Sequence, residues 1–420
     1  MTYPPVAVFD ADLPTGLAVT RSLGRAGVPV TVYGDSRTAV ARHSRFAAAF
    51  CECPHLGDSD LFVDWLTDEL TAGRITLIAP TSDSVMFHTA CAVDRLRSPV
   101  DVGHPRPQAI FDCLLKQQFA RALDSYGFPT PATAIPTSIS DAIEFAEKVG
   151  YPLVSKPRTH VGAGVHRGDV YETESDLRSG FAPYEIGDGH ESALAHDPDL
   201  QWPLLQEFIG VESLEVVSVS GCLSPEGDVL AVGHSRKERL WPPQLGIGTL
   251  FVALESHPFT DHVLDATRAI LGSGIFEFEV LYHPETGDYW AIDLNPRAFG
   301  QMTLDIARGN DLPALWYEAV TGERLQQPGP RSPVPDRWQL GVPLLTDLSI
   351  EIASGPDRRI RLNELRHSLG RSSVGAVADW ADPIPALAFS RSFLRHPGGL
   401  VRPYLARSWP QRFGADSRTR

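Results

Sequence analysis

The stretch that decides the fold runs from residue 274 to residue 297 and reads GIFEFEVLYHPETGDYWAIDLNPR. Two apolar runs broken by polar residues flank the short segment PETG, residues 284–287. A glycine-containing loop of this length between alternating runs is typical of an antiparallel hairpin. The second run is interrupted by Asp293, Asn295 and Arg297, so one strand end carries an acid, an amide and a guanidinium.

Four polar side chains of this hairpin can share one face, because successive side chains of a strand point to opposite faces of a sheet. They are Glu277, Glu279, Asp293 and Asn295. If residues 285–287 form the loop, Glu279 lies opposite Asp293. The neighbouring pair on this face is then Glu277 with Asn295. A shift of two residues would instead pair Glu277 with Asp293.

Carboxylates gathered on one face of a sheet need a neutralising cation, since like charges directly across a sheet destabilise it. Carboxylate and amide oxygens are hard ligands that suit Mg²⁺, which usually takes one or two carboxylates together with substrate phosphates. The hairpin therefore predicts a metal site. The alternative is a half-exposed strand whose polar face lies in water.

Length and composition limit the class of protein. A chain of 420 residues is long enough for two or three domains, and 43% hydrophobic with 21% charged residues is ordinary for a folded, soluble protein. The net charge of -15 disfavours nucleic acid as the main partner. The five cysteines show neither a disulfide framework nor a zinc-ligand spacing. We find no signal peptide and no apolar run long enough for a membrane span, so we expect a cytoplasmic protein without a membrane partner.

The first hundred residues alternate apolar strands with helices, which predicts a parallel α/β layer. Strands are expected over 6–9, 28–35 and 75–83, with a helix over 16–24. The first turn from strand to helix lacks the glycine pattern of a dinucleotide site, which argues against a dehydrogenase. Asp83 ends the last of these strands, where substrate residues often lie, but a helix N-cap is its expected role.

From about residue 106 the pattern becomes α+β, and after about residue 330 a proline-rich segment indicates a linker. We expect three parts, an N-terminal α/β domain, an α+β domain and an appended region: 1–105, 106–330 and 331–420. Within the second part a strand pair is expected over 204–209 and 214–221. Residues 386–420 carry seven arginines against one acid and form a basic tail, whose expected role is a solvated arm. A docking surface for a partner is the alternative.

The segment Asp293-Leu-Asn295-Pro-Arg297 resembles the end of the metal-binding hairpin of the ATP-grasp superfamily, Glu-x-Asn-x-Arg. Lys116, in LLKQQFARALDSYGFPTP, and Lys156, in YPLVSKPRTHVGAGV, match two lysines of that superfamily. Four elements in the family order cover residues 110–305. SRKERLWPPQLGIGT and AIDLNPRAFGQ are most similar to the carboxylate-amine ligase branch, which includes D-aspartate ligase-like proteins. The resemblance implies an α/β N-terminal layer followed by an α+β ATP-grasp fold of two lobes.

The resemblance implies an ATP site with a hinge near residues 206–210. Lys116 and Lys156 would hold the α and β phosphates, since lysine suits phosphate oxygens. Gly162, Ala163 and Gly164 would form a lid, beside which His160 can touch substrate or phosphate. The adenine would lie against a hinge made of Gln206, Glu207, Phe208 and Ile209. Glu215 would bind the ribose, with Glu212 as the second choice. Without this resemblance Lys116 would read as an exposed helix lysine.

The same resemblance implies two Mg²⁺ ions, or Mn²⁺, bound by Glu277, Asp293 and Asn295. In the family a glycine commonly lies three residues before the first acid. Gly274 has this spacing to Glu277, which favours Glu277 over Glu279 as the first metal ligand. Asp293 departs from the family pattern, which has glutamate there. This shorter carboxylate keeps the charge but draws the metal closer to the strand.

The implied function is an ATP-dependent carboxylate-amine ligase that forms an amide or peptide bond through an acyl phosphate, on amino acids or small peptides. Arg297 and Arg236, or Lys237 in place of Arg236, would hold the carboxylate or the tetrahedral intermediate, because a guanidinium suits planar oxyanions. A surface salt bridge is the alternative for Arg236 and Lys237. No side chain stands out as the base for the amine.

Two other functions share this core: a non-catalytic ATP-binding module, and another phosphoryl-transfer or carboxylating enzyme. The expected partners are small-molecule carboxylate and amine substrates. ATP-grasp ligases are often dimers, which leaves a homodimer open.

Overall fold

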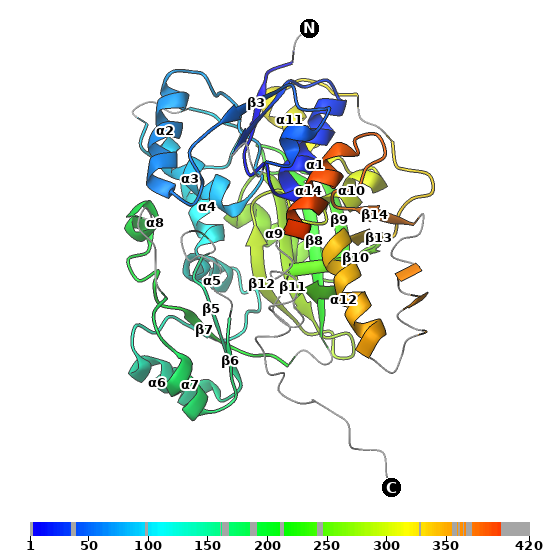
Figure 1. Ribbon diagram of the computed structural model, residues 1–420. Helices are drawn as coiled ribbons and strands as arrows, with labels where there is room; N and C mark the ends of the chain where they lie inside the picture. The colour runs from blue at the N-terminus through cyan, green and yellow to red at the C-terminus, as the bar shows by residue number, and fades with distance from the viewer. Residues whose placement is uncertain are drawn as a thin grey trace.

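Figure 1 shows the computed structural model of the chain, with an N-terminal layer at the top, a small lobe at the lower left and a large sheet at the right. The residues that the structure describes are 3–34, 39–96, 100–159, 161, 168–184, 191–210, 214–241, 247–326, 329–354, 359, 362–363, 365–366 and 372–395. Among these residues no helix combines the length and the apolar character that a membrane span requires.

The N-terminal layer is built on three short parallel strands in the order β1-β2-β3, which confirms the predicted parallel α/β layer. Its elements are β1 (Val6–Val8), α1 (Pro14–Arg25), β2 (Val30–Gly34), the 3-10 turn η1 (Ala41–His43), β3 (Ala49–Glu52), α2 (Ser59–Thr71) and α3 (Asp83–Asp94). The strand predicted over 75–83 is reduced to a parallel bridge between Ala7 and Ile78. Pro80 follows shortly after, and proline has no N–H with which to continue the ladder.

The small lobe contains a four-stranded sheet in the order β4-β7-β5-β6. The elements from α4 to β7 in chain order are α4 (Pro107–Leu114), α5 (Lys116–Ser125), β4 (Thr133–Ala134), α6 (Ile139–Val149), β5 (Leu153–Lys156), β6 (Val170–Tyr171), α7 (Glu174–Gly180), α8 (Glu191–His196) and β7 (Leu204–Glu207). Of the helices, α6 and α7 share a core with this sheet, whereas α4 and α8 pack with the N-terminal layer and α5 with the large sheet. β5 pairs with β7, so Lys156 at the end of β5 lies opposite Leu204.

The large sheet has seven strands in the order β12-β11-β8-β9-β10-β13-β14. The strands and helices of this lobe are β8 (Glu215–Leu223), β9 (Val229–Trp241), β10 (Ile247–Leu254), α9 (Thr260–Ile270), β11 (Gly274–Tyr282), β12 (Tyr289–Asn295), α10 (Met302–Arg308), α11 (Leu312–Thr321), β13 (Arg337–Gln339), α12 (Gly341–Ser354), β14 (Ser373–Gly375) and α14 (Ile384–Arg395). β7 and β8 lie in different sheets, so the strand pair predicted over 204–209 and 214–221 is wrong.

The predicted hairpin forms from β11 and β12, and its register is the first of the two alternatives. Glu279 lies opposite Asp293, and Glu277 lies opposite Asn295. A register shift follows directly, because Val280 is opposite Ala291 and one residue of β12 is left over. Gly287 in the loop has a φ of +79°, a conformation that glycine adopts without steric cost.

One face of the large sheet is covered by α5 and α9. A buried cluster on this face joins the two helices to β8 and β11, and its largest members are Phe119, Phe128, Phe259, Phe276 and Phe278. The N-terminal layer packs on the same lobe through α10, α11 and the residues before α10. Phe299, which precedes α10, and Trp316 and Tyr317 of α11 share a core with β1 and α1. This packing brings the carboxyl end of β1 towards the end of β12.

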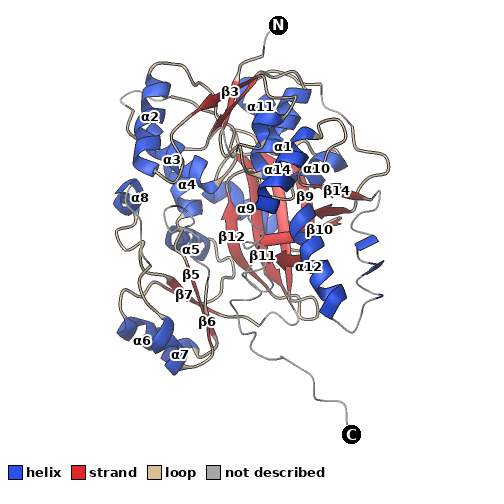
Figure 2. Cartoon of the chain, viewed as in Figure 1, coloured by secondary structure: helices blue, strands red, loops and turns tan. Residues whose placement is uncertain are grey.

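Residues beyond 330 extend the large sheet. β13 pairs antiparallel with β10 and parallel with β14, and α12 packs on β9 and β10 (Figure 2). Asp382 accepts a hydrogen bond from Arg21 Nε at 2.9 Å, which ties the segment before α14 to the N-terminal layer. The division into domains at 105 and 330 stays a prediction, and residues 396–420 of the basic tail lie outside the described residues.

Candidate active site

One face of the large sheet carries the predicted acids. Strand alternation places on it Glu277 and Glu279 of β11, Asp293 and Asn295 of β12, Ser218 of β8 and Lys237 of β9. The contacts agree with this arrangement, because Lys237 Nζ lies 2.6 Å from Glu279 Oε1 and Ser218 Oγ donates to Glu277 Oε1 at 2.8 Å. We call this surface the acid face.

Glu277 is the most enclosed of the acids, with 5% of its surface exposed. Asn295 Nδ2 donates to its Oε2 at 3.1 Å, and Gln301 Nε2 donates to its Oε1. Burial, followed by the charge of Glu279, raises the pKa of Glu277, although Lys237 and Arg297 oppose the rise. Additional positive charge near Glu277 would therefore favour its ionised form.

The two predicted lysines come from different elements and converge on the acids. Lys116 Nζ, at the start of α5, lies 3.0 Å from Asp293 Oδ1. Lys156 Nζ, at the end of β5, donates to Gln206 Oε1 at 2.7 Å. Burial and then the charge of Lys116 lower the pKa of Lys156 to about 8, while Asp293 and Glu279 act in the opposite direction. A bound anion would stabilise both ammonium groups.

Arg297 connects the acid face to the N-terminal layer. Its Nε and Nη2 donate to the two carboxylate oxygens of Asp83 at 2.8 and 3.2 Å, and Nη2 also donates to Asn295 Oδ1 at 2.8 Å. Burial alone would lower the pKa of Arg297, but Asp83, Glu277 and Asp293 outweigh burial and raise it. Asp83 was expected to be the N-cap of α3, and this is wrong. Ser82 is the N-cap, since its Oγ accepts from Val85 N.

The structure brings Asp10 to this region, which the sequence analysis missed. Asp10 follows β1 and has a φ of 51°, and its Oδ2 accepts a hydrogen bond from Ser82 Oγ. Burial raises the pKa of Asp10 to about 7, Asp12 and Asp83 add to the rise, and Ser82 and Arg297 oppose it. The only signal in the sequence is its position after a parallel strand, where ligands often bind in open α/β sheets.

Gln301 and Asp305 were also missed. Gln301 precedes α10 and donates to Glu277, while Asp305 lies one turn into this helix and accepts from Ser220 Oγ at 3.0 Å. Burial raises the pKa of Asp305 to about 7, and Glu277 adds to the rise. Gln301 thus contacts Glu277 directly, and Asp305 acts on it through charge.

Arg236 and Glu215 are not brought to the acid face. Arg236 lies opposite Val217, whose side chain belongs to the core on the other face of the sheet. Its guanidinium pairs with Glu215 Oε1 and with Glu238 Oε1, both at 2.6 Å, and it is 34% exposed. This arrangement matches the salt-bridge alternative for Arg236, whereas Lys237 meets the acids.

The predicted hinge begins in β7. Gln206 contacts Lys156 as described, and Gln206 Nε2 donates to Thr133 Oγ1 at 2.9 Å. Glu207 is exposed and its Oε2 accepts from Ala132 N at 3.3 Å, while Phe208 N donates to Pro152 O at 3.1 Å. Ile209 follows in a half-buried position. The predicted residues that lie outside the described ones are His160, Gly162, Ala163, Gly164 and Glu212.

The oxygen atoms of the acid face could supply some of the ligands of a Mg²⁺ ion, and phosphate oxygens and waters would supply the others. Among the described residues no group of three His, Cys, Asp or Glu side chains is close enough to hold a metal ion. Mg²⁺ commonly takes only one or two carboxylates plus phosphate oxygens and waters. Glu277, Asp293 and Asn295 supply hard oxygens for that kind of site, and a cation bound there would lower the raised pKa of Glu277 and favour its ionised form.

Sequence comparisons give distant relatives. No family model matches the chain. The large chain of carbamoyl phosphate synthase from Rubrobacter xylanophilus is 25% identical over 228 residues, which cover 54% of this chain and 20% of the relative. The N-terminal section of that enzyme's large chain from Aquifex aeolicus is 23% identical over 184 residues, or 43% of this chain and 31% of the relative. The matches thus span a third or less of these relatives.

Solved structures match over most of the chain. N5-carboxyaminoimidazole synthetase from Staphylococcus aureus has a TM-score of 0.57 at 15% identity, with 78% of this chain and 80% of that chain covered. The biotin carboxylase domain of Hydrogenobacter thermophilus 2-oxoglutarate carboxylase has a TM-score of 0.61 at 16% identity, with 78% of this chain and 71% of that chain covered. The L-amino acid ligase from Bacillus licheniformis has a TM-score of 0.53 at 16% identity, with 76% of this chain and 75% of that chain covered.

These similarities show that the chain has the ATP-grasp fold, with an α/β N-terminal layer in front of the ATP-grasp core. The fold implied by the hairpin and the two lysines is therefore confirmed. The matched proteins include carboxylating enzymes as well as an amino acid ligase, and the comparisons single out no branch.

Proposed function

We propose that the protein is an ATP-dependent carboxylate-amine ligase, which forms an amide or peptide bond between amino acids or small peptides. The observation that carries the proposal is the convergence of Lys116 and Lys156 on the acids of β11 and β12, directly beside Arg297. Cations and acids placed together in this way suit a metal-bound polyphosphate, and Arg297 suits a carboxylate next to it.

In the proposed complex the ATP phosphates bind the ammonium groups of Lys116 and Lys156 in place of the present partners of these lysines. Lys116 now contacts Asp293, and Lys156 contacts Gln206, so both ammonium groups already point to one region. Because burial makes the charge of Lys156 costly, an anion there is favoured. Residues 206–209 are proposed to hold the adenine. The ribose role of Glu215 stays a prediction, since Arg236 binds that carboxylate.

Glu277, Asp293 and Asn295 are the residues that would hold Mg²⁺, which when bound neutralises phosphate charge in phosphoryl transfer. The chain's own contribution is to orient these oxygens. Ser218 and Gln301 hold Glu277 on one side, and Arg297 holds the amide oxygen of Asn295. Lys237 neutralises Glu279 on the same face.

The reaction has two steps. An oxygen of the substrate carboxylate attacks the γ-phosphorus of ATP, the bond from this phosphorus to the bridging oxygen breaks, and ADP leaves. The amine nitrogen then attacks the carbonyl carbon of the acyl phosphate, the carbon–oxygen bond to phosphate breaks, and the nitrogen gives up a proton. Arg297 and Lys237 are proposed to stabilise the oxyanions, because charged donors fixed in a buried site act strongly on developing charge.

Asp10 is our candidate for the group that accepts the amine proton. It lies among Asp12, Asp83 and Arg297, and a pKa of about 7 suits a general base near neutral pH. Such a base must be ionised to act, so turnover should rise as the pH increases through about 7.

Replacing Asp10 with asparagine tests this role. We expect Asp10→Asn to lower the rate of amide formation by about 10²-fold, because general base catalysis contributes that much or more. The variant should also lose the rise in rate near pH 7, as measured by initial rates from pH 5.5 to 9. An unchanged pH profile in Asp10→Asn would exclude Asp10 as the base.

Two other functions use the same core. A carboxylating enzyme would activate bicarbonate in place of an organic acid, and a non-catalytic module would bind ATP without turnover. The comparisons include a biotin carboxylase domain in complex with MgADP and bicarbonate. For this reason bicarbonate has to be one arm of the experiment.

The function is tested by incubating the protein with ATP, Mg²⁺ and pooled amino acids, with and without bicarbonate. The ligase predicts ADP, phosphate and new masses equal to two amino acids less water, independent of bicarbonate. ADP formed only with bicarbonate would favour the carboxylating enzyme. Bound ATP without any ADP would favour the module, and AMP with pyrophosphate would contradict the acyl phosphate.

Neighbouring residues of β9 give a matched pair of variants. Lys237→Met is expected to lower turnover by about 10²-fold, because Lys237 lies on the acid face beside Glu279. Arg236→Met removes the same charge from the opposite face and should change turnover by about twofold at most. Initial rates and melting temperatures of both variants provide the check. Equal losses, or a greater loss in Arg236→Met, would contradict the assignment of the faces.

A further inference from the structure

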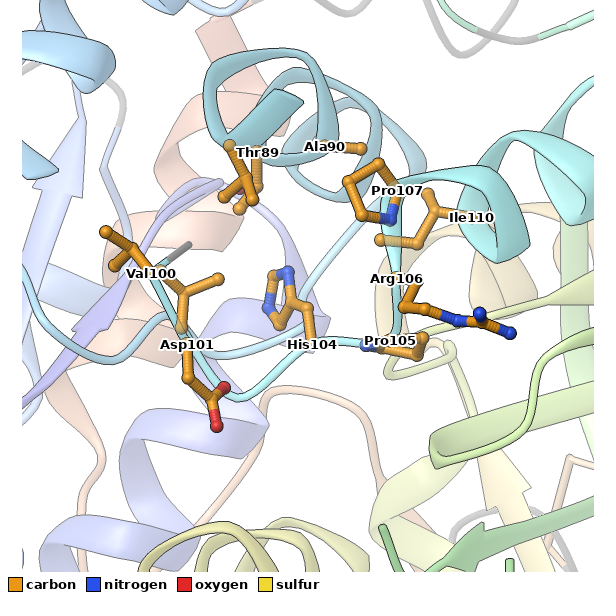
Figure 3. A pocket seen from close by; sticks show the side chains of 11 residues that line it. Thr89, Ala90, Val100, Asp101, His104, Pro105, Arg106, Pro107 and Ile110 are labelled. Carbon is orange, nitrogen blue, oxygen red and sulfur yellow. The ribbon is translucent and has the colours of Figure 1, made fainter. Parts of the chain in front are cut away.

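A cavity lies between α3, α4 and a joining segment formed by residues 100–106, and no residue of the acid face lines it (Figure 3). Its volume is about 320 Å³, within the range of small-molecule pockets. Most of the lining is apolar and comes from Ala90 and Val93 of α3, Val100 and Val102 of the joining segment, and Pro107 and Ile110 of α4. Asp101 and Arg106 also line it, and both are exposed.

Two polar atoms in this lining have no hydrogen-bond partner among the described residues. They are Thr89 Oγ1 and His104 Nδ1. Thr89 is 1% exposed, and Figure 3 shows Thr89 and the His104 ring on the same cavity. A buried polar group without a partner is destabilising, so both atoms favour a ligand that satisfies them.

The tautomer of His104 fixes what it can accept. His104 Nε2 lies 2.7 Å from the carbonyl oxygen of Ile78, and a carbonyl oxygen only accepts, so Nε2 carries the proton. Burial lowers the pKa of His104 to about 4, against the opposing effects of the Ile78 carbonyl and Asp101, so the ring is neutral. Nδ1 is therefore an acceptor, whereas the Thr89 hydroxyl can donate or accept.

The wall that carries His104 is held in place by other contacts. Trp316 Nε1 donates to the carbonyl oxygen of Gly103 at 2.8 Å, and Gly103 N donates to Asp101 Oδ1 at 2.8 Å. A Cβ on Gly103 would lie 2.6 Å from Leu77 and 2.9 Å from Trp316, so the segment is closely packed there. The cavity is thus formed by fixed elements, as small-molecule sites usually are.

We propose that this cavity binds a small, neutral, largely apolar molecule with one hydroxyl group, such as a phenol. The ligand hydroxyl donates to His104 Nδ1 and accepts from the hydroxyl of Thr89, while its apolar part lies against the aliphatic lining. A hydroxyl is favoured over a carboxylate or an ammonium, because a charged group would be costly in a lining that is mostly apolar. The site is independent of ATP and of the proposed ligase reaction.

Binding of 4-fluorophenol to the full chain, followed by fluorine NMR and by calorimetry, tests the proposal. We expect saturable binding to one site, and binding of 4-fluorotoluene, which lacks the hydroxyl, to be weaker by about tenfold, in keeping with one or two lost hydrogen bonds. Thr89→Val should lower the affinity for 4-fluorophenol about five- to tenfold and leave that for 4-fluorotoluene nearly unchanged.

Two further variants complete the experiment. Val93→Phe fills part of the cavity and should abolish binding of both probes. Thr71→Val removes an exposed helix hydroxyl that bonds Thr67 O, and it should leave binding unchanged. Melting temperatures confirm that each variant is folded. If Val93→Phe is not folded, Thr89→Val alone tests the site. No saturable binding to the native chain, or equal binding by the native chain, Thr89→Val and Val93→Phe, would overturn the proposal.

Discussion

Replacing Asp293 with alanine is expected to lower ATP-dependent turnover by about 10²- to 10³-fold while the protein stays folded. Asp293 lies on the edge strand β12 and is 23% exposed, so its removal leaves no large cavity in the core. Its carboxylate contacts Lys116 and is a proposed ligand of the metal that would neutralise phosphate charge, so its removal takes away the charge stabilisation on which phosphoryl transfer mainly depends. ADP release at saturating ATP, together with the melting temperature, measures both quantities.

Three companion variants sharpen this test. Asp293→Glu restores the residue usual in the superfamily and should keep most of the activity, whereas Asp293→Asn keeps the size but loses the charge and should behave like the alanine variant. Asp265→Asn alters a 75% exposed acid on α9 and is the matched control. Binding of Mn²⁺ in the presence of ADP, followed by electron paramagnetic resonance, should weaken in Asp293→Ala. Full turnover in that variant would overturn the metal assignment.

The hairpin was predictable because its determinants are local. Alternation with a period of two places Glu277 and Asn295 on one face, and the loop around Gly287 sets the register. A shift by one residue would turn the apolar residues outward, so the sequence specifies this element strongly. The strand expected over 75–83 failed for an equally local reason, since Pro80 ends its pairing after a single bridge.

The rest of the site depends on contacts between distant parts of the chain. Arg297 meets Asp83, which is 214 residues away in sequence, only because the N-terminal layer packs against α10 and α11. No spacing in the sequence predicts that packing, and for this reason Asp83 was expected to be a helix N-cap. Asp10 was missed for the same reason, since the packing that brings it near Asp83 and Arg297 appears only in the folded chain.

The choice between Arg236 and Lys237 shows a second limit. Neighbouring residues of a strand face opposite sides, so only the pairing of β9 with β8 decides which of the two meets the acids. A register irregularity lies between Cys222 and Leu223 in this pair, and such shifts are set by packing more than by sequence pattern. The sequence left both residues open, and the structure places Lys237 beside Glu279.

Arg297→Met is expected to have the second large effect, on turnover and on stability together. The guanidinium donates one hydrogen bond to each carboxylate oxygen of Asp83. The side chain of Arg297 is 17% exposed and that of Asp83 is 13% exposed. Removing one partner of a buried pair leaves the other charge uncompensated and typically costs about 3–5 kcal/mol. Urea unfolding at pH 7.5 measures this loss. Turnover should fall by about 10³-fold, because Arg297 is also proposed to stabilise the oxyanions.

A double variant separates the two roles of Arg297. Asp83→Asn in the Arg297→Met background removes the uncompensated carboxylate, so it should recover most of the lost free energy of unfolding. It cannot return a guanidinium to the reacting oxygens, and turnover should stay as low as in Arg297→Met. If the double variant regains both stability and turnover, Arg297 acts only by neutralising Asp83, and the proposed contact with the substrate carboxylate is wrong. Recovery of stability alone supports a direct role in the reaction.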